Sequence, residues 1–170
     1  MNSNNQKPTV AIIGGGPAGL MAAEVLSEAG VAVHLYDSMP SVGRKFLLAG
    51  KGGLNLTHSE GPDAFASRFG SRRDVVEPLL AAFGPDALRA WAAGLGIETF
   101  VGSTGRVFPT DMKAAPLLRA WLHRLRHPAG AQAAPVTFHM RHRWAGLDAA
   151  GALLFDTPLG RQVVSAPAPG

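Results

Sequence analysis

The stretch that decides the fold is Thr9–Asp37, TVAIIGGGPAGLMAAEVLSEAGVAVHLYD. It begins with Val10–Ile13, a short apolar run rich in β-branched side chains, which predicts a buried strand. Glycines then follow at the spacing G-x-G-x-x-G, a helical stretch runs to Gly30, and a second apolar run ends on Asp37. This order of strand, glycine-rich turn, helix and strand predicts the first βαβ unit of a Rossmann-like α/β domain.

Each glycine of the turn meets a separate physical demand. Gly14 permits the tight turn, Gly16 lets the backbone approach a pyrophosphate, and Gly19 lets the helix pack closely on the strand. The helix N-terminus adds unpaired N–H groups and a partial positive charge. Asp37 lies 18 positions after Gly19, where an acid accepts a ribose hydroxyl group and disfavours the 2′-phosphate of NADP. The predicted dinucleotide site comprises Gly14, Gly15, Gly16, Pro17, Ala18, Gly19 and Asp37. The alternative is a glycine-rich turn in another α/β protein.

The helix between these strands has one polar stripe. Glu24, Ser27 and Glu28 follow the spacing i, i+3, i+4. We expect this stripe to face water, because a helix on a sheet turns its apolar side toward the protein. The residues expected to face protein are Leu20, Ala22, Ala23, Val25, Leu26 and Ala29.

Composition excludes several classes of protein. The chain has 170 residues, of which 46% are hydrophobic and 16% charged, so it is long and apolar enough to bury a core. It contains no cysteine, which excludes disulfides, thiolate metal sites and cysteine nucleophiles and fits a cytoplasmic location. No apolar stretch reaches membrane-spanning length, and residues 1–8 read as a flexible tail. The net charge of +4 comes from dispersed arginines, so we expect no nucleic-acid or membrane partner.

A second glycine-rich stretch, residues 38–57, follows Asp37 directly. Its glycines permit close approach of the backbone to a ligand, its cations can contact phosphates, and its short polar side chains can contact the same ligand. These groups are Arg44, Lys45, Gly50, Lys51, Gly52, Gly53, Asn55 and Thr57. A mobile surface loop with solvated cations is the competing interpretation.

The middle of the chain predicts helices. Asp74 and Glu77 form an N-cap and N3 pair before an apolar run that ends at Gly84. Further helices are predicted from Pro85 to about Gly94 and over 114–127, with a strand over 97–101 between them. The motif Gly105–Pro109 places Arg106 where it could bind an anionic substrate group or the edge of a cofactor, or pair with Glu98.

The C-terminal third predicts strands. Residues 136–144 alternate apolar and polar side chains and are expected to form one strand, followed by strands over 152–156 and 162–165 in an antiparallel meander. His142 falls on the apolar side and is expected to be a core residue. His123 and His127 stand at i, i+4 but lack the glutamate of H-E-x-x-H, so we predict no metal site. No acid–base pair is evident, and the catalytic residues are unassigned.

The motifs together resemble a known family. Gly14–Gly19, Asp37 and Gly43–Lys45 resemble the FAD-binding N-terminus of two-dinucleotide-binding-domain flavoproteins, and residues 43–57 resemble the HI0933-like or YhiN-type family, also called the aminoacetone oxidase family. The commoner family form is Ser-Gly-Gly-Gly-Arg-Cys-Asn-Leu-Thr-Asn. This chain has Lys51, Gly53 and Leu54 in place of the middle glycine, the arginine and the cysteine, so no role of those three carries over.

The resemblance implies a flavoprotein oxidoreductase that uses bound FAD for two-electron chemistry, with a small-molecule substrate and NAD(P)H as a candidate electron donor. In this family Arg44 and Lys45 would lie on the phosphate side of FAD, while the 50–53 loop, Asn55 and Thr57 would approach its ribityl or ring region. Family members are more than twice as long, so residues 9–170 are expected to form a partial, apparently truncated FAD-binding domain. The alternatives are a non-catalytic fragment that binds nucleotide weakly or not at all, and an NAD-binding module.

Overall fold

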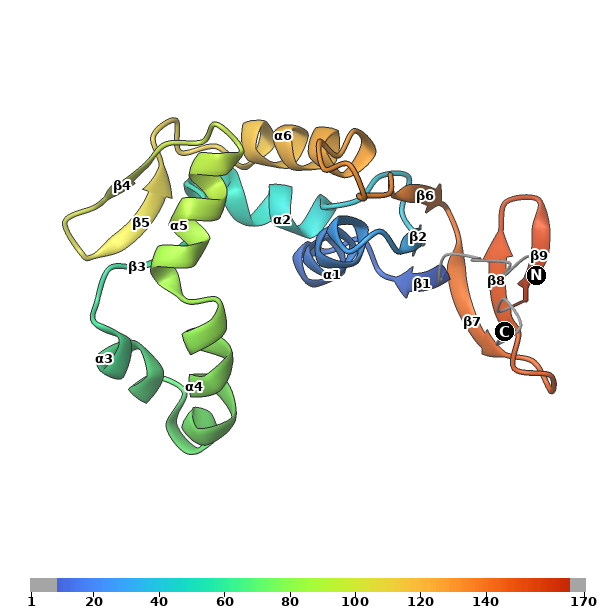
Figure 1. Ribbon diagram of the computed structural model, residues 1–170, viewed down its shortest axis with the longest axis horizontal. Coiled ribbons are helices and arrows are strands. Elements are labelled where there is room, and N and C mark those ends of the chain that lie inside the picture. The colour runs from blue at the N-terminus through green and yellow to red at the C-terminus, as the bar shows by residue number, and fades with distance from the viewer. Residues whose placement is uncertain (1–8, 166–170) are drawn as a thin grey trace. The chain divides into compact units, whose positions relative to one another are not determined.

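The computed structural model describes residues 9–165 (Figure 1). The chain forms two compact units. One comprises the residues up to Phe46 together with those from Leu122 onward, and the other comprises Leu47–Trp121. The tail expected at residues 1–8 and the proline-rich end at 166–170 lie outside the described residues.

A three-stranded parallel sheet forms the centre of the first unit. Its strands are β1 (Thr9–Ile13), β2 (Ala32–Asp37) and β6 (Thr137–Met140), in the order β1-β2-β6. Helix α1 (Pro17–Glu28) connects β1 to β2, as the opening stretch of the sequence predicts. β2 lies between the other two strands, and its Val33 and Leu35 are fully buried for that reason. The α/β class and the βαβ start are therefore confirmed.

Two of the three residues in the polar stripe of α1, Glu24 and Ser27, are buried, so the expectation that they face water is wrong, whereas Glu28 is exposed as expected. Glu24 forms an ion pair with Arg124 from the last turn of helix α6 (Ala114–Arg126). The Ser27 hydroxyl donates a hydrogen bond to the carbonyl of Ala134, at 2.6 Å. Val25, expected inside, is 59% exposed. Glu24 and Ser27 are buried because α6 and the segment after it bring polar partners that satisfy these two groups.

Residues 136–144 form two strands rather than the single strand expected. Arg141 adopts a left-handed conformation, with φ of 59°, and this breaks the extended chain. β6 before the break joins the parallel sheet, whereas β7 (Arg143–Leu147) pairs with β8 (Leu153–Thr157), which pairs with β9 (Gly160–Val164). The antiparallel meander is thus confirmed, with its first strand beginning later than predicted.

Aromatic packing joins the meander to the parallel sheet. Phe155 of β8 is fully buried, and its ring stacks on Tyr36 of β2 with 4.4 Å between centroids. The His142 ring meets Tyr36 and Phe155 edge-on. His142 is therefore a packed residue within hydrogen-bonding reach of neighbours, as expected from its place on the apolar side.

The second unit combines short helices with a small antiparallel sheet. The sheet order is β3-β5-β4, from β3 (Thr57–His58), β5 (Arg106–Pro109) and β4 (Thr99–Val101). The helices are α2 (Arg44–Ala49), which begins in the first unit, α3 (Pro62–Ser67), α4 (Arg73–Ala82), α5 (Pro85–Gly94), and the single turns η1 (Gly50–Gly52) and η2 (Gly70–Arg72). In the core, Trp91 packs edge-on against Trp121 at 4.7 Å.

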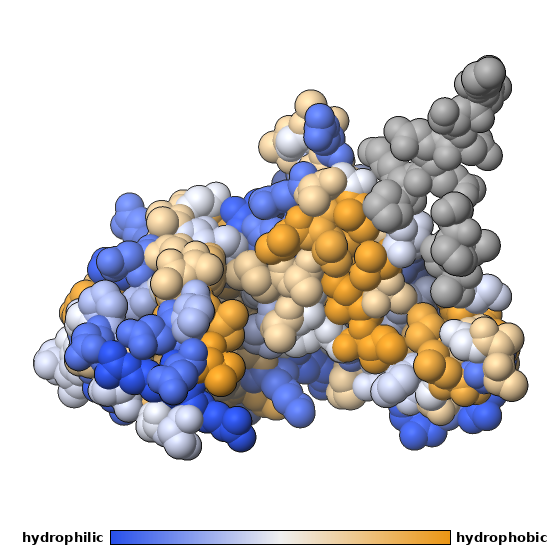
Figure 2. Space-filling view, turned by 60° about the horizontal axis from the view of Figure 1, so that its bottom comes forward, coloured by the Kyte–Doolittle hydropathy of each residue, from blue (hydrophilic) through white to orange (hydrophobic). Residues whose placement is uncertain are grey.

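Two details of this unit differ from expectation. Asp74 lies in the first turn of α4, whose N-cap position is Arg72 without a side-chain cap, so the predicted capping pair does not form. Phe83, the last residue of the apolar run predicted before Gly84, is 42% exposed rather than buried. Large apolar side chains lie at the surface of both units, and Figure 2 shows such areas among charged residues on one face. Within residues 9–165, no helix combines the length and the apolarity needed to cross a bilayer.

Breaking the Glu24–Arg124 pair tests the buried stripe. Glu24→Leu is expected to destabilise the protein by about 3 kcal/mol, because it leaves Arg124 partly buried without this carboxylate. The double variant Glu24→Leu/Arg124→Met should recover most of that loss, and urea unfolding measures both. Glu28→Leu, one turn further along α1 and exposed, is the control and should change stability by about 0.5 kcal/mol or less. Equal losses at Glu24 and Glu28 would contradict the buried pair.

Candidate functional site

Two glycines of the β1–α1 turn are required by backbone geometry. Gly14 has a φ of 107°, and its N–H donates to the Tyr36 carbonyl oxygen at 2.8 Å. A Cβ at Gly19 would lie 1.9 Å from the Gly14 carbonyl oxygen. No side chain fits at that distance, so α1 approaches β1 this closely only with glycine at position 19.

Gly15 is held on both sides by neighbouring segments. Its N–H donates to Oδ2 of Asp37 at 2.7 Å, and its carbonyl oxygen accepts the N–H of Gly43 at 2.8 Å. A Cβ at Gly15 would lie 2.3 Å from Cγ1 of Val42, which is 4% exposed. The turn is therefore fixed between the end of β2 and the chain that follows it.

Gly16, in contrast, faces open space. Gly16 is the N-cap residue of α1, and no side chain caps the helix there. A Cβ added at Gly16 would have no heavy atom within 4 Å. Pro17 occupies the first helical position, so the N–H groups of Ala18 and Gly19 begin the helix without acceptors one turn back. The free N–H groups and the partial positive charge at this end of α1 can stabilise a negatively charged group.

Asp37 is a fixed carboxylate at the carboxyl end of β2. Besides the bond to Gly15, its Oδ1 accepts the N–H of Met39 at 2.7 Å. A carboxylate offers about four acceptor positions, so two are left for further donors. Within residues 9–165, no cation forms an ion pair with Asp37. The group suits a diol that donates two hydroxyl protons and repels a phosphate.

Arg44 and Lys45 directly follow Gly43, whose N–H donates to the Gly15 carbonyl oxygen in the glycine turn. Gly43, with a φ of 69°, redirects the chain into α2, and both cations stand exposed in its first turn. The bond from Gly43 to Gly15 ties them to the turn. Neither forms an ion pair in the part of the chain that the structure describes, so their charge is available to an anion.

The second glycine cluster is anchored within the second unit. A Cβ at Gly50 would lie 2.6 Å from that of Ala114, and the N–H of Leu54 donates to the Met112 carbonyl at 3.0 Å. Gly53 has a φ of 112°. Gly52 faces open space, and Lys51 is exposed beside it in η1.

Asn55 and Thr57 belong to the edge of the small sheet. Thr57 pairs with Val107 in the β3–β5 ladder. The Asn55 amide nitrogen, in the orientation that satisfies its hydrogen bonds, donates to the carbonyls of Val107 at 3.2 Å and Thr57 at 2.8 Å. Arg106 is exposed on β5, and the described residues include no ion pair between it and Glu98.

His58 is a residue of this region that the sequence reading missed. Its Nδ1 accepts the N–H of Glu60 at 3.2 Å, and its Nε2 lies 2.9 Å from the Thr104 carbonyl oxygen, which fixes the tautomer with the proton on Nε2. A Cβ at Gly105, where φ is 77°, would lie 2.6 Å from the His58 ring. The glycine before Arg106 is thus needed to fit His58, a pairing visible only in three dimensions.

The predicted residues therefore gather within each unit. The first unit brings together Gly14–Gly19, Asp37, Arg44 and Lys45. The second brings together Gly50–Gly53, Asn55, Thr57 and Arg106 in segments that share the β3–β5 ladder or its approach. In residues 9–165 no group of three or more His, Asp or Glu side chains is arranged so that it could hold a metal ion, and the ring centroids of His123 and His127 lie 4.9 Å apart.

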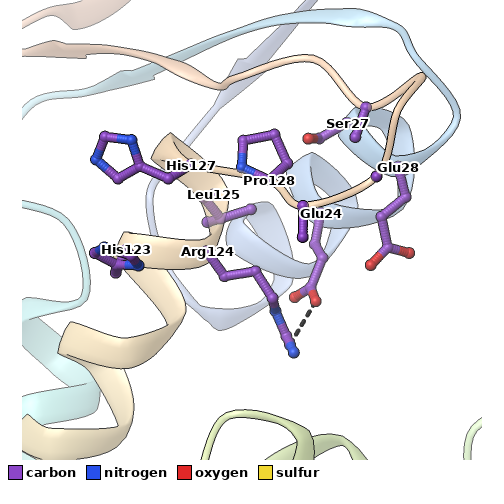
Figure 3. A pocket seen from close by; sticks show the side chains of 11 residues that line it. Glu24, Ser27, Glu28, His123, Arg124, Leu125, His127 and Pro128 are labelled. Atoms are coloured by element: carbon purple, nitrogen blue, oxygen red, sulfur yellow. Dashed lines mark ion pairs between the residues drawn. The ribbon is translucent and has the colours of Figure 1, made fainter.

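A cavity of about 470 Å³ lies away from the glycine turn, between the C-terminal halves of α1 and α6 (Figure 3). Glu24, Arg124 and Glu28 line it, and the dashed line in Figure 3 marks the ion pair at its wall. None of the residues predicted to bind a cofactor lines this cavity. It is a groove between two helices that the buried pair holds together.

Comparisons with known proteins agree on the type of domain. The family profile described as the HI0933-like protein Rossmann domain matches residues 8–166. A curated relative, the carotenoid phi-ring synthase of Streptomyces griseus, is 38% identical over 74 residues, which cover 41% of this chain and 14% of the synthase.

Solved structures share the fold. A flavocytochrome c3 fumarate reductase in an open conformation superposes with a TM-score of 0.66 at 15% identity, over 96% of this chain and 33% of that one. The 3-ketosteroid-delta4-(5alpha)-dehydrogenase of Rhodococcus jostii RHA1 superposes with a TM-score of 0.62 at 14% identity, over 96% of this chain and 45% of that one. The chain spans less than half the length of each of these relatives. The family profile matches nearly the whole of this chain, and the βαβ turn is in place. This chain therefore belongs to the HI0933-like family and carries its Rossmann domain.

Proposed function

We propose that this chain binds FAD and forms the cofactor-binding part of an FAD-dependent oxidoreductase. The observation that carries the proposal is the open face of Gly16 at the start of α1, beside the fixed Asp37 carboxylate. Membership of the HI0933-like family and a fold shared with a flavocytochrome support FAD over other dinucleotides.

The diphosphate of FAD would lie against the Gly14–Gly19 turn. A side chain at Gly16 would project into that space, and glycine leaves it clear. The N–H groups that begin α1 and the partial positive charge of the helix would stabilise the phosphates. Arg44 and Lys45, exposed and tied to the turn through Gly43, would add two cations on the same side.

Asp37 would accept the hydroxyl protons of the adenosine ribose. Both its oxygens already accept main-chain N–H groups, so the carboxylate needs no reorganisation when the ribose arrives. The same negative charge would reject a 2′-phosphate. An NAD-binding module uses an acid in the same position, and binding measurements with both dinucleotides distinguish the two functions.

By the family resemblance, Gly50–Gly53, Asn55 and Thr57 approach the ribityl chain or ring, and Arg106 offers a cation to the ring edge or to an anionic substrate group. When bound, FAD supplies the two-electron redox chemistry, while these residues bind and orient it. The same proposal includes NAD(P)H as the candidate electron donor to the bound FAD.

A valine at Gly16 tests the phosphate subsite. Gly16→Val should weaken FAD binding about 100-fold, because its side chain fills the space left for the diphosphate while α1 still forms. Calorimetry with FAD measures the affinity, and circular dichroism checks the fold. Gly61→Val is the matched control, since Gly61 also caps a helix and also faces open space. Unchanged FAD affinity in Gly16→Val, or equal losses in both variants, would contradict the site.

An asparagine at Asp37 tests the ribose subsite. Asp37→Asn keeps one acceptor for Gly15 and removes the charge, so FAD affinity should fall about 10- to 100-fold and discrimination against NADP should decrease. The titration compares FAD, NAD and NADP on both proteins. Asp86→Asn, an exposed acid in the first turn of α5, is the control. Tighter binding of NAD than of FAD to the unmodified chain would favour the NAD-binding function.

A further inference from the structure

Three histidines that the proposed function does not use meet where the meander packs on the parallel sheet. We name His34, His139 and His142 the histidine cluster. His34 is on β2, His139 on β6, and His142 on the link to β7. The rings of Phe155, Tyr36, His139 and His34 form one continuous stack, with centroid separations of 4.4, 4.4 and 5.2 Å. The His142 ring meets Tyr36, His139 and Phe155 edge-on.

The cluster contains a direct imidazole–imidazole hydrogen bond. Nδ1 of His34 and Nε2 of His139 lie 2.9 Å apart, so one of these nitrogens carries the proton and the other accepts it. The pair can bind one more proton without losing this hydrogen bond. That proton must go to the second nitrogen of the donor ring, which takes no part in the bond. A second added proton sets two N–H groups against each other at that distance and places two positive charges in contact.

No acid compensates such a charge. The groups that face His139 are His34 and Tyr36 from β2 and His142 from the link to β7. Phe155 of β8 contacts Tyr36 and His142, and Gln162 of β9 reaches the cluster through His142. In the described part of the chain, none of the three histidines forms an ion pair with a carboxylate. Burial, with smaller contributions from His34 and His142, lowers the pKa of His139 below its usual value.

Water can reach one end of the stack. His34 and Tyr36 line a cavity of about 330 Å³ between the parallel sheet and the meander, together with Ala11, Leu153 and Val164. Protons therefore have access to the His34 side of the pair without unfolding of the domain.

The same link contacts the Asp37 segment through its backbone. The N–H of His142 donates to the Asp37 carbonyl at 2.8 Å, and the N–H of Arg141 donates to the Met39 carbonyl at 3.1 Å. The His142 ring bonds the Met140 carbonyl at 2.8 Å and the Gln162 side chain at 2.9 Å. The 140–142 link, which carries one histidine of the cluster, thus holds the chain beside the carboxylate that we propose binds the ribose.

We propose that the histidine cluster is a proton-sensitive latch, which in its neutral or singly protonated form holds the meander and the 140–142 link on β2 and which releases them when His139 is protonated against His34. The folded state disfavours the proton on His139, so the latch is closed near neutral pH and loosens as the pH falls below the ordinary histidine pKa of about 6.5. Its effect on the cofactor rests on the proposed function: release would free the Asp37–Met39 segment and weaken FAD binding in acid.

Hydrogen exchange of the intact 170-residue chain tests the latch without any cofactor. Between about pH 7.5 and about pH 5, after correction for intrinsic rates, amides of β7 and β8 should lose about tenfold protection relative to those of β1. His139→Gln, which cannot take up the charge, should abolish most of this difference. His127→Gln, an exposed histidine at the end of α6, is the control and should behave as the unmodified chain.

Imidazole NMR titration covers the case in which His139→Gln does not fold. In the unmodified chain the His139 resonances should titrate below the ordinary histidine pKa of about 6.5, and β7 and β8 amides should shift with the same midpoint. Titration of His139 at or above the ordinary histidine pKa of about 6.5, or uniform protection at both pH values, would overturn the latch. If the unmodified chain binds FAD at about pH 7.5, lowering the pH to about 5 should weaken its FAD binding. This loss of affinity should be about tenfold larger than the loss in His139→Gln over the same pH range. Absence of FAD binding at both pH values contradicts the proposed function, while the exchange result still decides the latch.

Discussion

The hydrogen bond from the Gly15 N–H to the Asp37 carboxylate is the interaction on which the first unit depends. It ties the β1–α1 turn to the end of β2, and the Gly43 N–H closes the same turn from the other side. Because the turn is fixed, the open face of Gly16 and the carboxylate keep a constant separation. The proposed subsites for a diphosphate and a ribose would then be parts of one rigid element, which would lower the ordering cost of binding an extended dinucleotide.

Polar contacts also attach the outer elements to this centre. The Glu24–Arg124 pair and the Ser27–Ala134 hydrogen bond hold α6 and the following segment on α1, and the backbone bond from His142 to Asp37 holds the start of the meander on β2. Each contact joins residues about one hundred positions apart. Segments from residue 124 onward are therefore attached to α1 and to β2, the strand that carries Asp37.

The sequence predicted local features well, since their causes are local. The glycine spacing, the acid at the end of β2 and the order of helices follow from steric rules within a few residues, and the structure has them. The burial of Glu24 on α1 was not predicted, because its partner Arg124 lies 100 positions later in the sequence. A periodic pattern within one helix does not reveal such a distant partner. The break between β6 and β7 depends on the left-handed φ of Arg141, which the alternation of side chains does not reveal. The need for glycine at position 105, next to the His58 ring, arises only when β3 pairs with β5.

The measurement that tests the central claim most directly is an amide NMR titration of the chain with FAD. Binding at the proposed site predicts that the largest shifts occur at Gly15, Gly16, Ala18, Gly19 and Met39, whose N–H groups line the turn or contact Asp37. Shifts confined to the groove between α1 and α6, or no shift in the glycine turn at saturating FAD, would contradict the account.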